Sequence, residues 1–438
     1  MRRLLALAGL SLVAASAQCI VNNPGGNKLN PNRPSDAETP AASFSPISTL
    51  NDSLPNWICF NAGYRTRYEE TGSSDYLLTR FRVGMRVAPL SWMKIYTEVQ
   101  DADAFFKTPP LGPPYQETWD LRTAYVDLGQ IDEGRFALRV GRQDLSFGDG
   151  QLIGTSYWRN ASRGYDAVEA VTNWGRWSAT AFAASQVQIS DNGLSHHQPG
   201  NDLYGLDGKL NAVIRDAVVE PFVFWRVTSA LKLNEKTAGV RVSGAIHSVW
   251  DYESEGSIQR GSQAADRIRA AAWLGIAGYT FHVRGLKTRL SAKAALASGD
   301  RHPGDGVRGT FDQLFPNVHD HLGMADQFGW QNLRMVRSGG RVWLRSNWIV
   351  AAIWNDYWLA SATDGYYNSS GAIVARDVTG RSGTHIGEEY DFETSYRANR
   401  EIEFGAGLGR VLPGEFLDKT HHPAAFSYPY VMMNYNFF

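Results

Sequence analysis

WICFNAGYRTRYE, residues 57–69, alternates apolar and large polar side chains with a period of two, which is the pattern of a β-strand with two different faces. Ile58 and Phe60 fall on one face, and Arg65 and Arg67 fall on the other. A soluble sheet this charged on one face would have to bury its other face against a second layer, and no helical layer is visible in the sequence. The stretch therefore predicts a membrane strand, with lipid on one face and water on the other.

The same alternation recurs along the chain, at residues 77–87, 93–100, 267–274, 287–294 and 401–408. In the third of these repeats we expect the apolar residues to face lipid and the arginines to face inward, namely Ile268, Ala270, Ala272 and Leu274 against Arg267 and Arg269. Slips of phase near Thr123 to Val126 and near Ile349 to Trp354 predict β-bulges.

Connections between the repeats alternate between tight turns and long loops, as in bacterial membrane barrels. The tight turns are expected at residues 88–91, 129–134, 173–175, 212–216, 246–248, 281–285, 345–347 and 397–399. The long loops are expected at residues 105–117, 148–163, 190–201, 300–328, 361–382 and 412–425. Because backbone groups cannot meet water in hydrocarbon, such a sheet has to close on itself. We predict an all-β fold, a transmembrane antiparallel barrel of about 18 strands, wide enough for an aqueous channel.

Residues outside the repeats predict export to the bacterial outer membrane. Residues 1–17 have the basic start, apolar run and small-residue cleavage site of a signal peptide. Residues 18–56 predict a disordered periplasmic leader, and residues 57–438 the barrel. The last strand, Tyr428 to Phe438, alternates and ends in an aromatic residue, which resembles the signal read by the barrel assembly machinery. Cys19 and Cys59 could pair in an oxidising compartment.

The charge composition indicates that any electrostatic function depends on local groups of charged residues rather than on the net charge. A net charge of −1 argues against nucleic acid as a partner. Arginine outnumbers lysine by about four to one, and its planar fork suits carboxylates. An anionic partner is one explanation, and pairing with the chain's own Asp and Glu is the other. The 14 Trp and 19 Tyr fit the aromatic girdles of a membrane barrel.

Three stretches are similar to the alginate-export family of outer-membrane barrels. They are LRVGRQDLSFGDGQLIG with the following YWRNASRGYDAVEA (138–170), ASGDRHPGDGVRGTFDQLFPNVHDHLGMAD (297–326) and HIGEEYDFETSYRANREIEFGAGLGRVLPGEFL (385–417). The resemblance implies an eighteen-strand barrel whose lumen is narrowed by charged residues, mostly arginine, and covered by loops. It also implies outward passage of an anionic uronate polymer, although family membership does not fix the substrate.

Carried over residue by residue, the resemblance implies a basic substrate pathway made of Arg65, Arg67, Arg80, Arg82, Arg122, Arg139, Arg142, Arg241, Arg267, Arg269, Arg289, Arg337 and Arg341. It implies counter-charges at Glu69, Glu98, Asp127 and Glu389. Arg142 departs from the alternation that turns Phe136, Leu138 and Val140 outward. A bulge or a position at the rim would explain it.

Cofactor and catalytic motifs are weak. Asp300, Asp305 and Asp312 lie among glycines and could hold Ca²⁺, but the order of ligands in known calcium loops is missing. The histidine pairs in predicted loops match no closed metal set. No nucleophile motif stands out, so we expect no catalytic residue and no cofactor.

The expected function is passive, electrostatically guided diffusion of an anionic polysaccharide, such as a polyuronate, through the barrel. A substrate-specific uptake porin for small anions would share the barrel and the basic lumen. A barrel hydrolase is the third alternative. The expected partners are outer-membrane lipid, the anionic solute, the assembly machinery and periplasmic secretion proteins, with no nucleic acid.

Overall fold

A closed antiparallel β-barrel makes up most of the protein, as the repeats predict. The structure is a computed structural model that describes residues 46–72, 74–106, 112–131, 134–191, 193–211, 213–422 and 425–437. One sheet holds nineteen strands, of which the two-residue β14 (Val307–Arg308) only flanks β12 in parallel. The other eighteen form the barrel wall, so the predicted fold class is confirmed.

The first nine barrel strands are β1 (Ile58–Thr71), β2 (Ser74–Leu90), β3 (Met93–Phe105), β4 (Glu117–Leu128), β5 (Phe136–Gln143), β6 (Tyr165–Trp174), β7 (Trp177–Gln188), β8 (His196–Asn211) and β9 (Ala217–Thr228). The other nine are β10 (Leu233–Ile246), β11 (Trp250–Gln263), β12 (Asp266–Val283), β13 (Leu286–Ala297), β15 (Leu333–Arg345), β16 (Trp348–Leu359), β19 (His385–Arg397), β20 (Ile402–Pro413) and β21 (Phe426–Phe437).

Short elements lie before the wall and in the loops. They are α1 (Pro46–Asp52), η2 (Ser229–Leu231), α2 (Val318–Leu322), β17 (Gly365–Tyr367), β18 (Ile373–Arg376) and α3 (Glu415–Lys419). In the described part of the chain, none of the helices has the length and apolarity to cross a membrane.

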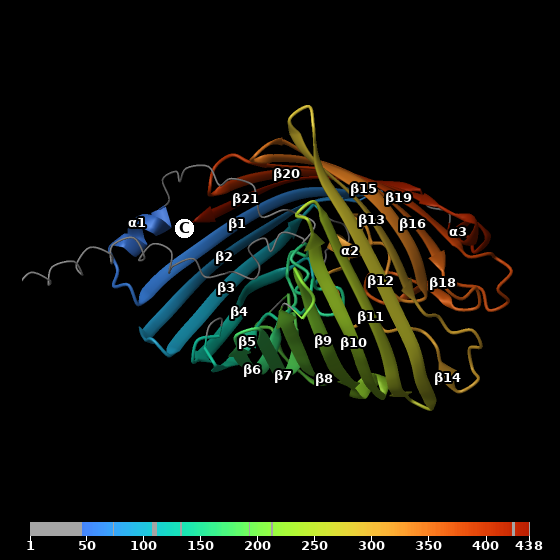
Figure 1. The fold of residues 1–438 in the computed structure, drawn as a ribbon, viewed down its shortest axis with the longest axis horizontal. Helices are drawn as coiled ribbons and strands as arrows, with labels where there is room; N and C mark the ends of the chain where they lie inside the picture. Colours follow the sequence, from blue (N-terminus) through green and yellow to red (C-terminus); the bar gives the residue numbers. More distant parts are fainter. Residues whose placement is uncertain are drawn as a thin grey trace, which may run out of the picture.

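The ring closes where β1 pairs with β21 (Figure 1). Tyr64 stands opposite Tyr435, and Ala62 stands opposite Phe437, while the other edge of β1 pairs with β2. Closure leaves no unpaired sheet edge, which is the condition for a sheet to lie in hydrocarbon.

The connections alternate as the sequence predicts. Every predicted tight turn joins two successive strands, and the long loops leave from the opposite end of the barrel. By the general pattern of such barrels, the long-loop end is extracellular. One predicted loop, residues 190–201, is shorter than expected, because β8 already begins at His196.

One of the two predicted bulges is present. The pairing of β3 with β4 shifts after Glu98, whose partner is Thr123, to Val99, whose partner is Leu121. The bulge predicted at residues 349–354 was wrong. β16 pairs with β19 without a break from Trp348 to Tyr357, and the phase seemed to slip because apolar side chains occupy both faces of this strand.

The segment before the barrel is partly helical. Helix α1 lies at residues 46–52, inside the stretch expected to be disordered. The Asn51 side chain fixes it to β1, since its amide donates to the Phe60 carbonyl and its oxygen accepts the Phe60 N–H, both at 2.8 Å. The predicted signal peptide and Cys19 lie outside the described residues. Cys59 is a buried free thiol that accepts a hydrogen bond from Arg86 Nε.

The hydrophobic core lies inside the barrel rather than between two layers. Apolar side chains on the inner face, among them Phe224 and Leu274, pack against loop residues that include Leu152, Phe315 and Phe328. Residues 144–164 and 310–332 thus fold into the lumen (Figure 1), whereas residues 301–305 are exposed. The large exposed apolar side chains are mostly those that face away from the barrel axis, where lipid covers them.

Candidate functional site

A group of arginines lies on the inner face of β1 and β2. Alternation turns Arg65 and Arg67 of β1 inward, together with Arg80 and Arg82 of β2. Arg65 and Arg80 stand directly opposite each other in the register of the two strands. Two like charges at opposed positions repel, so this arrangement requires acceptors from elsewhere.

The acceptors come from the loop between β5 and β6, which enters the lumen. Arg65 donates to the main-chain carbonyl oxygens of Tyr157, Trp158 and Arg159 at 2.9, 3.2 and 3.1 Å. Arg80 donates to the carbonyls of Tyr157 and Arg159 at 3.3 and 3.4 Å. Among the described residues, neither Arg65 nor Arg80 forms a salt bridge. Their two charges therefore meet only neutral oxygen atoms.

Trp158 joins this loop to the wall through its indole ring. The Arg67 guanidinium carbon lies 3.8 Å from the ring centre, and the His319 ring stacks on it at 3.9 Å. Two groups this close to one ring centre have to lie on opposite faces of it. Burial disfavours a charged imidazole, but the Asp326 carboxylate, 3.3 Å away, holds the pKa of His319 above its ordinary value.

The remaining arginines of this wall have polar or acidic partners. Arg82 donates to Gln100 and to the Ser162 hydroxyl, both at 2.6 Å. Arg122 forms a salt bridge with Asp144. Arg139 forms a bidentate salt bridge with Asp127, at 2.6 and 2.9 Å. This wall therefore combines arginines that have polar or acidic side-chain partners with the pair Arg65 and Arg80, whose partners are neutral oxygen atoms.

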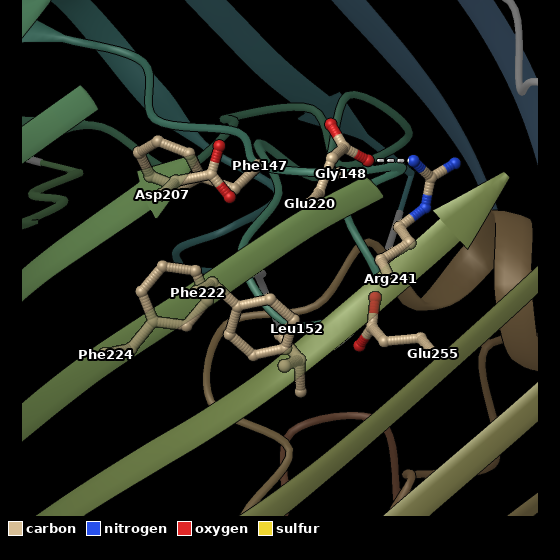
Figure 2. A pocket seen from close by; sticks show the side chains of 9 residues that line it. All are labelled: Phe147, Gly148, Leu152, Asp207, Glu220, Phe222, Phe224, Arg241 and Glu255. Atoms are coloured by element: carbon tan, nitrogen blue, oxygen red, sulfur yellow. Dashed lines mark hydrogen bonds and ion pairs between the residues drawn. The ribbon is translucent and has the colours of Figure 1, made fainter. Parts of the chain in front are cut away.

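A second group of charges lies on the inner face of β9 to β11, around Arg241 (Figure 2). Arg241 reaches from β10 to Glu220 on β9, and it binds Glu253 on β11 at 2.9 Å. Glu255 is buried beside them, with one carboxylate oxygen that has no hydrogen-bond partner. Gly148 of the lumen loop has a φ of +58°, and a Cβ there would lie 3.1 Å from Arg241 Cδ. Glycine is therefore what lets the loop pass this close to the arginine.

Most of the predicted pathway residues do face inward. They are Arg65, Arg67, Arg80, Arg82, Arg122, Arg139, Arg241, Arg289, Arg337 and Arg341, with Glu69, Glu98, Asp127 and Glu389. Arg289 binds Asp251 at 2.8 Å, and Arg337 binds Asn355 at 2.6 Å and the carbonyl of Asp320 at 3.1 Å. Whether these residues form a substrate pathway stays a prediction.

The expected inward orientation of Arg267 and Arg269 was wrong. Both side chains are exposed on the outer face of β12, while Ile268 and Leu274 are buried on its inner face. The reason is that the lumen at this level holds the apolar core formed by the loops, so β12 turns its apolar side inward. Both arginines lie near the start of β12, at its long-loop end.

Arg142 also faces outward, without a bulge, because the pairing of β5 with β6 is continuous. It binds its cross-strand neighbour Asp166 at 2.9 Å and the Ser195 carbonyl at 3.0 Å. Its position at the long-loop end of β5 supports the second explanation, a place at the rim. Its prediction as a lumen residue was therefore wrong.

The four predicted counter-charges have different partners. Glu69 pairs with Arg67, and Asp127 pairs with Arg139. Glu98 lies 3.8 Å from Arg82. Glu389 is fully buried and accepts the N–H of Ala325 at 2.7 Å, so it anchors a lumen loop rather than an arginine.

The three predicted calcium ligands do not gather. Asp312 binds Arg226 at 2.6 Å, Asp300 accepts the N–H of His302 at 3.1 Å and Asp305 accepts the N–H of Val307 at 2.8 Å. In the described ranges, the group of three ligand-type side chains within mutual reach is a different one, Asp356, His385 and Glu388.

Several lumen residues were missed from the sequence. The acidic positions Asp251, Glu253 and Glu255 alternate along β11, so the period-two pattern could have revealed them. Trp158, His319 and Asn160 could not have been found this way, because they lie in loops without periodicity. Only the folded chain brings them to the wall.

Comparisons with known proteins agree with this architecture. The family described as Alginate export matches residues 58–428. Solved structures of Pseudomonas aeruginosa OccK11 (OpdR) and OccD3 (OpdP) are similar with TM-scores of 0.58 and 0.59, at 12% and 10% identity. The similarity covers 87% of this chain in both cases, and 96% and 91% of those chains. Acinetobacter baumannii OccAB4 has a TM-score of 0.56 at 10% identity, covering 86% of this chain and 97% of its own. No curated protein matches the chain.

The structural similarity, at these identities, concerns the fold. The family match spans most of the chain, from the first barrel strand into the last. A closed eighteen-strand barrel with exposed apolar side chains places the protein in the bacterial outer membrane. The protein is an outer-membrane β-barrel channel and belongs to the alginate-export family.

Proposed function

We propose that the lumen passes an anionic polysaccharide of the polyuronate type, by passive diffusion guided by the arginines of β1 to β5. The observation that carries this proposal is the pair Arg65 and Arg80, whose charges meet only neutral oxygen atoms, mostly main-chain carbonyls, in the described chain. A carboxylate is a stronger acceptor for a guanidinium than a neutral carbonyl. Uronate carboxylates can therefore take the place of these carbonyl oxygens.

Passage requires the loop at residues 144–164 to leave the arginines. In the structure its carbonyls occupy the positions that a solute's carboxylate would take. The loop thus competes with the solute for the same donors, and this competition keeps the hold on each carboxylate weak. Conduction needs binding that is weak and repeated along the pore, because a tight binding site would block the channel.

Acidic residues on the other wall support the same function. Glu220 and Glu253 surround Arg241, and Glu255 lies beside them. This arrangement repels a polyanion, so the solute is expected to follow the arginines of β1 to β5. The family and the similar structures are outer-membrane channel proteins, which supports a role without catalysis.

The test is the ion current of the full chain in planar bilayers, with a double variant Arg65→Gln and Arg80→Gln. We expect the variant to lose most of its preference for anions in a salt gradient. We also expect uronate oligomers to need about tenfold higher concentration for half-maximal inhibition, as for a loss of about 1.4 kcal/mol. Arg269→Gln is the matched control, because this arginine faces outward.

Unchanged selectivity and inhibition in the double variant would overturn the proposal, as would an equal loss in the Arg269→Gln control. A second arm compares small dicarboxylates with uronate oligomers. Stronger inhibition by the dicarboxylates would favour the alternative function, a substrate-specific uptake porin for small anions. Turnover of lipid or peptide by the purified barrel would favour a hydrolase.

A further inference from the structure

A cluster of metal-ligand side chains lies on the outer face of the barrel, away from the lumen. Asp356 of β16 stands opposite Glu388 of β19, and His385 begins β19. Each side chain offers one ligand atom, and these atoms lie within 4.8 Å of one another. His385 Nε2 is 2.8 Å from Asp356 Oδ1. Two strands and two kinds of ligand thus converge on one point.

The cluster lies on the outer face because its neighbours along both strands turn inward. Asn355 and Tyr357, on either side of Asp356, are fully buried in the lumen. Glu389, next to Glu388, is buried there too. The cluster is therefore separate from the pathway of the proposed function, and it lies at the long-loop end of β16 and β19.

The charge of the cluster is not balanced by the protein. In the described part of the chain, no lysine or arginine forms a salt bridge with Asp356 or Glu388, and the ionic partner of Asp356 is His385. A neutral imidazole leaves two negative charges side by side. A bound divalent cation would neutralise them both.

The ligands are held by further contacts, as metal ligands usually are. The Trp354 indole N–H and the Tyr390 hydroxyl both donate to Glu388 Oε2, at 3.3 and 2.5 Å. The His385 ring packs against Gly414, where a Cβ would lie 2.5 Å from Nδ1. Orientation of a carboxylate and of an imidazole by their surroundings is what distinguishes a built site from a chance group of charges.

We propose that Asp356, His385 and Glu388 form a Zn²⁺ site. Zinc takes imidazole nitrogen and carboxylate oxygen in a tetrahedral arrangement, with ligand atoms about 3.4 Å apart. The three side chains reach this spacing through shifts of about an ångström, and water completes the site. Calcium is a poor fit, because it requires six to eight oxygen ligands. The bound ion clamps β16 to β19 beside α3, which follows Gly414 in the chain.

The experiment is titration of Zn²⁺ into the detergent-solubilised full chain without an affinity tag, after removal of metals by a chelator. We expect one site per chain in calorimetry, and a higher melting temperature with Zn²⁺, since a ligand of the folded state stabilises it. His385→Ala is expected to abolish both effects. Asp356→Asn and Glu388→Gln are each expected to weaken binding at least tenfold, and Ca²⁺ should not bind there.

His421→Ala is the matched control, because His421 is an exposed histidine outside the cluster. It should leave Zn²⁺ binding unchanged. Binding that persists in His385→Ala, or that falls equally in His421→Ala, would overturn the proposal. Migration of the folded barrel on an unheated denaturing gel shows whether each variant folds. These readouts are independent of the ion current, so the zinc site and the proposed channel function can fail separately.

Discussion

Asn160 ties the lumen loop to the barrel wall through its side-chain amide. Its amide nitrogen lies 2.9 Å from the Thr79 carbonyl and 3.0 Å from the carbonyls of Asp103 and Tyr115. Its side-chain oxygen accepts a hydrogen bond from Arg65 at 3.3 Å. One buried amide thus connects the loop to β2, to β3 and to an arginine of the proposed pathway.

We predict that Asn160→Ala releases the loop and raises the open probability of the channel. Loss of buried hydrogen bonds to an amide costs about 1 to 3 kcal/mol, and 1.4 kcal/mol changes a population about tenfold. Single-channel recording should therefore show openings at least several times more frequent. Asn173→Ala is the control, since Asn173 binds carbonyls of a tight turn at the opposite end of the barrel. Equal opening frequencies in the two variants would mean that Asn160 does not hold the loop.

At the scale of elements, β12 shows what period-two alternation can and cannot predict. The pattern correctly separates Arg267 and Arg269 from Ile268 and Leu274, but it does not say which set faces lipid. The choice depends on what fills the lumen. For β1 and β2 the lumen face is charged, and the polar set points inward as expected. For β12 the loops bring an apolar core to that face. Because the loop sequences have no periodicity, they do not show in advance which side chains will fill the lumen there.

The loops that decide this orientation also carry Trp158, His319 and Asn160, the residues of the candidate site that the strand pattern could not predict. Period-two alternation was enough to predict that the arginines of β1 and β2 face inward, because the alternation continues over the whole strand. It could not place Trp158 or His319, whose stacking joins segments about 160 residues apart in the chain. Contacts of this kind depend on tertiary packing, on which local periodicity carries no information.

Helix α2 carries a second buried histidine, His321. A positive charge on its ring would oppose the packing of the lumen loops. Burial, reinforced by the charge of Lys293, lowers the pKa of His321 to about 4, against the opposing carboxylates of Asp320 and Glu253. Its Nε2 lies 3.1 Å from the Asp149 carbonyl, so α2 is bound to the loop at residues 144–164. Burial of the ring therefore favours a neutral imidazole in the folded arrangement.

We predict that acidification loosens the packing of α2 in the lumen, because a charged imidazole would be buried there. A lowered pKa contributes stability that is present above the unfolded value of about 6.5 and is lost as the pH falls towards 4. The loss over the full interval is on the order of 3 kcal/mol. Ion current through the wild-type channel should thus rise as the pH falls through this window, and His321→Gln, which cannot titrate, should flatten the rise.

His319, the other histidine of α2, has a pKa shifted in the opposite direction. The pKa of His319 is raised, so its contribution is complete below about pH 6.5 and is lost only as the pH rises through the folded value. His319→Gln should therefore raise the current at low pH, abolish the change of current with pH above about 6.5, and leave the acid rise towards pH 4 in place. An acid rise of the same size in His321→Gln as in the wild type would show that another group controls the loops.

For the whole molecule, the closed sheet determines which substitutions the membrane tolerates. Neighbouring residues of one strand meet two different solvents, since one faces hydrocarbon and the next faces the lumen. Ala292 and Ser291 in the middle of β13 illustrate this contrast. Ala292 is exposed on the outer face, and Ser291 lies on the inner face between Gly278 and Gly339 of the adjacent strands.

We predict that Ala292→Arg lowers the free energy of unfolding in lipid vesicles by about 2 to 4 kcal/mol, the cost of a guanidinium near the middle of a bilayer. Ser291→Arg, one residue away, should cost much less, because its side chain reaches the polar lumen beside two glycines. Urea titration of both variants in vesicles measures the difference. A barrel in detergent micelles, where the apolar layer is thinner and adapts to the charge, should show a smaller gap. Equal losses for the two variants in vesicles would contradict the inward and outward assignment of β13, and with it the orientation of Arg289, its inward neighbour.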